Sequence, residues 1–369
     1  MDHSIKPILL KIRDKRKIMK SAGVLCFLVL SLLLGFSSCG YHPHGCFPGD
    51  KLPAHIIPLT DFGQRAEWSI DCKKVYFLDK AGGEVWVVDT RSKKTKQITK
   101  LADRPAGHGY YRVLCLSNGD LLLGCGAKRE ELYFQILDKS CKKSPATIEG
   151  ESLCEGPAVS RKSMKIAWTL PGQKQIYTGA LAYADGQVKI INKKLLIDNA
   201  DGRVIVDGQE YETIIETQNW RPELEEELIY SEYRMGGDTL FKSEVFGVDI
   251  HTGKTVNYTQ SAHTYDEPEG IFPNGVYTLT ECDRHRPTRK SSTIEVYKLK
   301  LDGTAKDYER LTFFSDVEGF RASNPVVHDD GNSFVFQASE ANSAAGAGCG
   351  LYLFDIKKFE QAKQAPNNK

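Results

Sequence analysis

The sequence lacks the short motifs that mark several enzyme classes. It contains no CxxC pair, and its ten cysteines are widely spaced, so a zinc site built on cysteines is not expected. It contains no GxSxG motif, and one repeated strand pattern occupies the residues after position 55, so a separate hydrolase domain has no room. No helix follows the glycine-rich segment 343–350, as a phosphate-binding loop would require.

An excess of charge of one sign is also missing. The chain has 49 basic and 48 acidic residues, and seven of the basic residues precede Cys39. The remainder carries 42 basic and 46 acidic residues and is nearly balanced. Because no basic field would attract a polyanion, we do not expect nucleic acid as a partner.

Long apolar runs are scarce as well. One lies near the N-terminus, where residues 22–36 form an apolar run of 15 residues behind a basic lead. As a helix this run would reach about 22 Å, short of the roughly 30 Å hydrocarbon core of a membrane. We therefore expect residues 1–38 to be a signal peptide, with Met19 as an alternative start.

The apolar run ends in Ser37-Ser38-Cys39-Gly40, which resembles the lipobox of bacterial lipoproteins. The resemblance implies lipidation of Cys39, followed by a flexible tether over residues 39–54, which are rich in glycine, proline and histidine. The protein would then be exported and lipid-anchored in the bacterial cell envelope, at the outer membrane or on a periplasmic face. A plain secreted protein, or one held by an uncleaved anchor, is the alternative.

Eight cysteines follow Cys39, an even number that permits disulfides in an exported protein. Cys115, Cys125 and Cys282 lie inside strand-like runs, where a free cysteine acts as a small buried apolar residue. We predict that most of these thiols are free.

What the sequence does contain is one pattern that returns six times: an apolar residue, a turn, and a β-rich run. The repeats begin 43 to 61 residues apart, at Trp68, Leu116, Val159, Trp220, Phe272 and Val327. A third strand often ends in aspartate, and a fourth ends in threonine, as in KQIT (96–99), VNYT (256–259) and ERLT (309–312). Four antiparallel strands in about 50 residues are typical of one propeller blade.

The sixth repeat has no convincing fourth strand of its own. The segment HIIPLT (55–60) is unclaimed at the other end of the repeats, and its Pro-Leu-Thr finish resembles ERLT. The sequence therefore predicts an all-β fold over residues 55–369: a six-bladed β-propeller closed by an N-terminal strand that pairs into the last blade. Residues 188–208 are either a hairpin insertion or a concealed blade, so seven blades are the alternative.

The repeats resemble those of TolB-like propellers, in which an apolar residue precedes Ser-Pro-Asp-Gly and a β-run. EWSIDC, AVSRKS and VVHDDG each keep part of that motif, and the resemblance covers residues 55–357. The last two repeats resemble a subgroup of secreted bacterial TolB-like proteins without an assigned reaction. The resemblance implies a fold and an extracytoplasmic setting, and it does not carry a function.

Polar residues gather at the starts of the innermost strands, which converge on the central channel of a propeller. They suit a polar ligand such as a saccharide or a peptide end, although they could equally solvate the channel. The candidate ligand-binding residues are Glu67, Arg112, Glu155, Gln218, Asn219, Glu267, Glu269, Arg321 and Asn324, with Tyr111 beside them.

No metal or other cofactor is predicted. If a divalent cation is bound, His263, Asp266 and His285 are the first candidates as ligands, together with Glu267 and Glu269. The sequence favours a non-catalytic binding scaffold, tethered to a membrane, for a protein or polymer ligand. The alternative is a metal-assisted carbohydrate-active enzyme, similar to a polysaccharide lyase, that uses the channel mouth.

Overall fold

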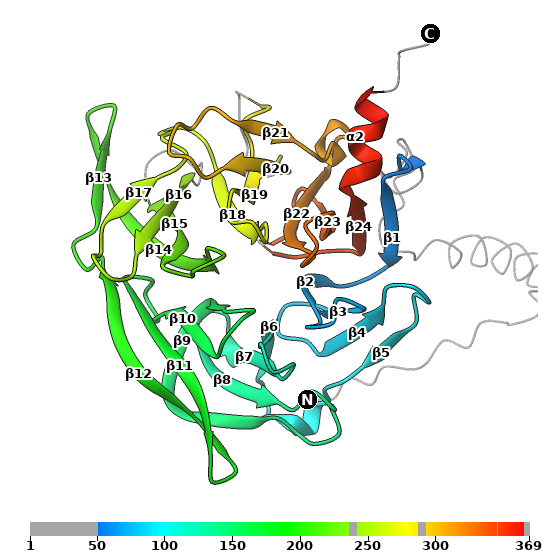
Figure 1. Cartoon of the computed structure of the whole chain (residues 1–369), viewed down its shortest axis with the longest axis vertical. Helices are drawn as coiled ribbons and strands as arrows, with labels where there is room; N and C mark the ends of the chain where they lie inside the picture. Colours follow the sequence, from blue (N-terminus) through cyan, green and yellow to red (C-terminus); the bar gives the residue numbers. More distant parts are fainter. Residues whose placement is uncertain (1–50, 236–241, 287–292, 345, 365–369) are drawn as a thin grey trace, which may run out of the picture.

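The computed structural model describes residues 51–235, 242–286, 293–344 and 346–364. The signal peptide, Cys39 and the tether up to residue 50 lie outside these ranges. Strands dominate the described chain, and they lie in a ring around a centre (Figure 1). Among the described residues, no helix combines the length and apolarity needed to cross a membrane.

The strands pair in six consecutive groups, numbered here as sheets 1 to 6. Sheet 1 contains β2 (Gln64–Trp68), β3 (Lys74–Leu78), β4 (Val85–Asp89) and β5 (Thr95–Gln97). Sheet 2 contains β6 (Gly109–Cys115), β7 (Leu121–Lys128), β8 (Glu131–Leu137) and the first half of β9 (Ala146–Val159). Sheet 3 contains the second half of β9, β10 (Lys165–Thr169), β11 (Gln175–Ala184) and β12 (Gln187–Asp198).

The second half of the ring follows the same order. Sheet 4 contains β13 (Arg203–Val206), β14 (Gln209–Trp220), β15 (Glu227–Met235), β16 (Lys242–Asp249) and β17 (Thr255–Asn257). Sheet 5 contains β18 (Asp266–Ile271), β19 (Tyr277–Cys282), β20 (Glu295–Lys300) and β21 (Tyr308–Arg310). Sheet 6 contains β22 (Phe320–Val327), β23 (Ser333–Glu340), β24 (Leu351–Asp355) and β1 (Ile56–Thr60).

The turns that join these strands are those that the sequence indicated. Gly275 and Gly331 have positive φ angles of 65° and 68°, in the Asn-Gly and Asp-Gly turns of sheets 5 and 6. A left-handed backbone at these points lets two strands reverse within a few residues, and glycine adopts it without a steric penalty.

The threonine of the repeat has a structural role. In three sheets its hydroxyl accepts a hydrogen bond of 2.8 to 3.1 Å from a backbone N–H of the neighbouring strand: Thr99 from Val85 of β4, Thr259 from Val245 of β16, and Thr312 from Val296 of β20. Thr60 accepts the equivalent bond from Leu351, the first residue of β24, at 3.1 Å. β1 therefore takes the place of a fourth strand in sheet 6, as predicted, and pairs antiparallel with β24.

The core is divided into six clusters of buried apolar side chains, each between neighbouring sheets. One cluster joins the last sheet to the first, since it combines Leu59, Val335 and Leu351 with Val75 and Phe77. Around the centre, each innermost strand contacts the innermost strand of the next sheet, and β22 of sheet 6 contacts β2 of sheet 1. Together these contacts give a propeller that closes between sheets 6 and 1.

Residues 188–208 do not form a sheet of their own. They belong to the long hairpin β11–β12 at the outer edge of sheet 3 and to β13, which adds to the edge of sheet 4. The described chain thus follows the hairpin-insertion alternative rather than a seventh blade.

Short helical segments complete the fold: two 3₁₀ turns, η2 (Leu101–Asp103) and η3 (Phe314–Asp316), and one helix, α2 (Ile356–Gln364). Phe359 of α2 packs against Phe354 of β24 and the ring of His55, with ring centroids 5.2 and 5.1 Å apart. Cys115, Cys125, Cys154 and Cys282 are buried free thiols, and the first two and the last are those that the strand pattern indicated.

Candidate functional site

The innermost strand of each sheet carries a β-bulge near the centre of the ring. The register of the ladder shifts in β2, β6, β9, β14, β18 and β22 alike. A bulge places two residues opposite one and re-aims the extra side chain. Residues at five of these register shifts line the cavities of the channel: Arg65, Glu155, Gln218, Glu269 and Asn324.

Three of the bulges contain a residue in a left-handed conformation. Arg65, Glu155 and Asn324 have φ angles of 53°, 60° and 46°. For an L-residue with a Cβ atom this conformation costs on the order of 1–2 kcal/mol. Such backbone strain is concentrated at functional sites, where a side chain must be held in one direction.

The channel contains two cavities of about 390 Å³ each, a size that suits small ligands, whose pockets hold about 300–1,000 Å³. One, the aromatic chamber, is lined at the ends of the innermost strands by Trp68, Trp220 and four prolines. The other, the acidic chamber, is lined by five glutamates: Glu155, Glu216, Glu267, Glu269 and Glu281. The two chambers share a waist of Arg65, Arg112, Glu216, Glu269 and Asn324.

The guanidinium groups at the waist make only long ion pairs. Arg112 lies 3.4 Å from both Glu155 and Glu216, and Arg65 Nη1 lies 3.8 Å from Glu155. Nη1 of Arg65 is buried, and none of the described residues accepts a hydrogen bond from it. A buried donor of this kind costs free energy unless a ligand or water satisfies it.

The carboxyl groups of the acidic chamber hold their protons more tightly than exposed ones do. Burial, followed by repulsion from Glu155 and Glu267, raises the pKa of Glu216 well above its ordinary value. Burial, followed by repulsion from Glu267, raises the pKa of Glu281 to about 8. Glu267 is held by hydroxyl donors, with Tyr233 at 2.5 Å and Tyr265 also bonded to it.

All nine ligand-binding candidates from the sequence line one of the two chambers. The structure divides them between the chambers, whereas the sequence placed them at one mouth, because the innermost strands span the depth of the channel. Glu67, Gln218 and Asn219 line the aromatic chamber, and Arg112, Glu155, Glu267, Glu269, Arg321 and Asn324 line the acidic chamber. Tyr111 lines neither, and its hydroxyl donates to the carbonyl of Ala127 at 3.2 Å.

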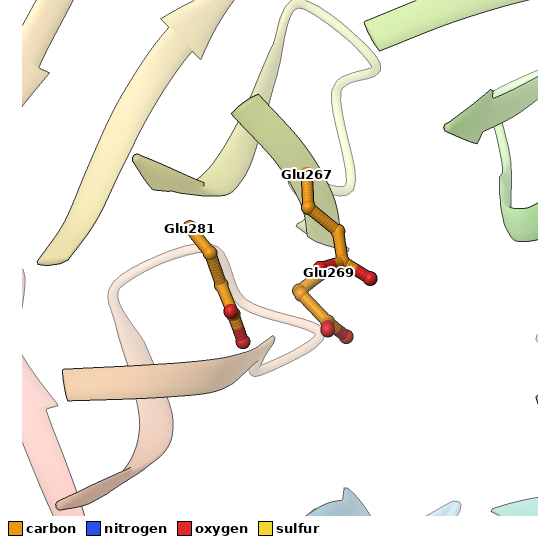
Figure 2. Close-up of side chains that lie close together, drawn as sticks. All are labelled: Glu267, Glu269 and Glu281. Atoms are coloured by element: carbon orange, nitrogen blue, oxygen red, sulfur yellow. The ribbon is translucent and has the colours of Figure 1, made fainter. Parts of the chain in front are cut away.

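The histidine-based metal candidates are not brought together. His263 is exposed and lies 3.3 Å from Asp207, Asp266 is paired with Arg284 at 3.0 Å, and His285 lies 2.9 Å from the hydroxyl of Ser315. In the described chain, the group that could hold a cation is instead Glu267, Glu269 and Glu281, whose nearest carboxylate oxygens all lie within 4.8 Å of one another (Figure 2).

Sequence reasoning missed Arg65, Glu216 and Glu281. Arg65 begins the segment RAEW (65–68), and Glu216 immediately precedes the segment TQNW (217–220). Only the bulge decides which residues of these segments face the channel. Glu281 lies on a second strand, β19, directly opposite Glu267 of β18. The alternation of side chains along paired strands was the signal that could have found it.

Comparison with known proteins places this arrangement in context. No protein-family model and no curated protein matches the chain. It is similar to the solved structure of a TolB-type protein from Agrobacterium tumefaciens, with 14% identity and a TM-score of 0.49 over 70% of this chain and 79% of that one. It is also similar to a gluconolactonase from Xanthomonas campestris, with 11% identity and a TM-score of 0.48 over 81% of this chain and 89% of that one. A third similar structure is the β-propeller domain of a protease from Pyrococcus furiosus, with 12% identity and a TM-score of 0.42 over 79% of this chain and 81% of that one.

The propeller predicted from the repeats is confirmed by the strand pairing of the described chain. The neighbours differ among themselves in function, and at these identities none of them carries an activity over to this chain.

Proposed function

We propose that the protein is a binding scaffold whose central channel takes the carboxylate-bearing end of a protein or polymer ligand. The observation that carries the proposal is the waist, where a strained bulge holds Arg65 and its buried Nη1 has no hydrogen-bond acceptor among the described residues. Arg112 lies beside it and pairs with Glu155 at 3.4 Å. A carboxylate fits a guanidinium group through two parallel hydrogen bonds, which makes it the natural ligand of such donors.

The aromatic chamber supplies the complementary apolar surface. Trp68 and Trp220 line it, and the indole N–H of Trp220 is buried without an acceptor among the described residues. A ligand whose body lies on these rings and whose end enters the waist would bury apolar area and satisfy both kinds of donor.

Binding of simple probes tests the proposal. Peptides with a free or an amidated C-terminus, and uronic-acid oligosaccharides, are titrated calorimetrically against the protein in EDTA. We expect the free carboxylate to bind and Arg65→Gln to weaken binding by about tenfold or more, because a charge-assisted hydrogen bond is lost. Arg203→Gln, on exposed β13, serves as the matched control. Equal affinity for the amide, or equal loss in both variants, would refute the role of the waist.

The membrane tether is part of the same proposal and rests on the Ser37-Ser38-Cys39-Gly40 sequence. A lipid on Cys39 would hold the propeller at the bacterial cell envelope by burying methylene groups in a bilayer. Cys39→Ser should abolish incorporation of a fatty-acid probe, and unchanged labelling of the variant would show that the site is elsewhere.

A metal-assisted carbohydrate-active enzyme is the second candidate, favoured by the cluster of Glu267, Glu269 and Glu281. Mass spectrometry of acidic oligosaccharides incubated with the protein and a divalent cation separates the two functions. Shortened products would favour the enzyme, and intact oligosaccharides would favour the scaffold.

A further inference from the structure

The three carboxylates of Glu267, Glu269 and Glu281 have the spacing of ligands on one cation. Their nearest oxygens lie within 4.8 Å of one another, and Figure 2 shows that the side chains of Glu269 and Glu281 project into the same space. Calcium bonds to oxygen at about 2.4 Å, so two of its ligands can be at most about 4.8 Å apart. Pairwise distances of this size are compatible with one calcium ion between the three residues.

Asn324 provides a second and independent observation. Its side chain is 8% exposed, and its Oδ1 has no hydrogen-bond partner among the described residues. Its Nδ2 donates to Glu269 Oε1 at 2.7 Å, and its backbone N–H donates to Glu281 Oε1 at 2.8 Å. Because a carboxylate accepts hydrogen bonds, the amide nitrogen must face Glu269, and the amide oxygen is left as a buried acceptor beside the cluster.

Positive charge is present in the acidic chamber, where Arg112 and Arg321 line the same walls as the cluster, but it is not paired with the cluster. None of the three carboxylates forms an ion pair with a residue of the described chain; Arg112 is paired with Glu155 and Glu216 instead. Hydroxyl and amide donors hold Glu267 but do not neutralise it.

We propose that Glu267, Glu269, Glu281 and Asn324 bind a calcium ion in the acidic chamber. The ligand set consists of oxygen alone, which suits a hard cation and disfavours zinc or copper. Calcium tolerates irregular geometry and six to eight ligands, so water from the open channel would complete its shell. The inference goes beyond the proposed scaffold function, because the chain alone supplies these ligands.

Calcium binding is tested on the full chain after removal of metals with EDTA. Addition of CaCl₂ should raise the melting temperature in a saturable way, since a ligand that binds only the folded state stabilises it. Glu281→Gln and Asn324→Ala should lose most of this shift. Glu212→Gln should keep it, because Glu212 is exposed on β14 and lines neither chamber.

Terbium luminescence gives a second readout that does not depend on stability. Tb³⁺ substitutes for Ca²⁺, and Tyr233 and Tyr265, both bonded to Glu267, lie close enough to sensitise its emission. We expect emission on excitation of tyrosine, loss of the signal when CaCl₂ is added, and little signal from Glu281→Gln. Absence of both a melting shift and tyrosine-sensitised emission in the wild-type chain, or equal responses in all variants, would overturn the proposal. The carboxylate titration is carried out in EDTA, so either proposal can fail without the other.

Discussion

Glu67 shows how burial controls charge in this channel. It lies 3.4 Å from Arg161, yet burial outweighs that attraction and raises the pKa of Glu67 from 4.5 to about 7. The folded state therefore binds the proton more tightly than the unfolded state does. Between pH 4.5 and 7 the contribution of this group to stability falls as the pH rises.

Glu67→Gln should remove this part of the pH dependence. Below pH 4.5 the wild type and the variant should have similar stability, and above pH 7 the variant should be more stable by on the order of 1–3 kcal/mol. Urea denaturation at several pH values measures the difference. A gap that stays constant across the range would contradict the raised pKa.

At the scale of the strand, the threonine that ends the fourth strand of the repeat is visible in the sequence, and the structure shows that its hydroxyl accepts a backbone hydrogen bond. Thr60→Val keeps the shape of the side chain but removes the acceptor for the Leu351 N–H. We expect a loss of about 1–3 kcal/mol, because a buried donor is left unsatisfied. Thr312→Val should cost a similar amount in sheet 5, whereas Thr60→Ser should cost less. Denaturation midpoints compare the variants.

The sequence was sufficient to predict the strands, because turns and the threonine pattern are local. It could not predict that β9 runs without a break from sheet 2 into sheet 3, since Gly150, Gly156 and Pro157 lie within it and glycine and proline usually interrupt strands. The sequence also placed the polar residues near the channel, but it did not show in which direction each side chain points. Those directions depend on bulges, which arise from the pairing of strands and have no consistent sequence signal here.

At the scale of the whole molecule, the ring depends on the segment before β2. β1 fills the outer place in sheet 6, and Leu59 belongs to the cluster between the last and first sheets. A chain that begins at Asp61 should melt at a lower temperature and self-associate, because the edge of β24 is exposed for pairing. A chain that begins at Lys51 is the control. Size-exclusion chromatography and thermal melting test both, and equal behaviour would mean that β1 does not close the ring.

The position of β1 also determines how the molecule would respond to mechanical load. Strand β1 lies at the outer edge of its sheet, beside β24 (Figure 1). It begins 17 residues after Cys39, a stretch of chain that reaches about 60 Å at most when extended. Any tension on an anchored N-terminus would therefore act first on β1, the strand that closes the ring. It would separate β1 from β24 before it strained any other sheet.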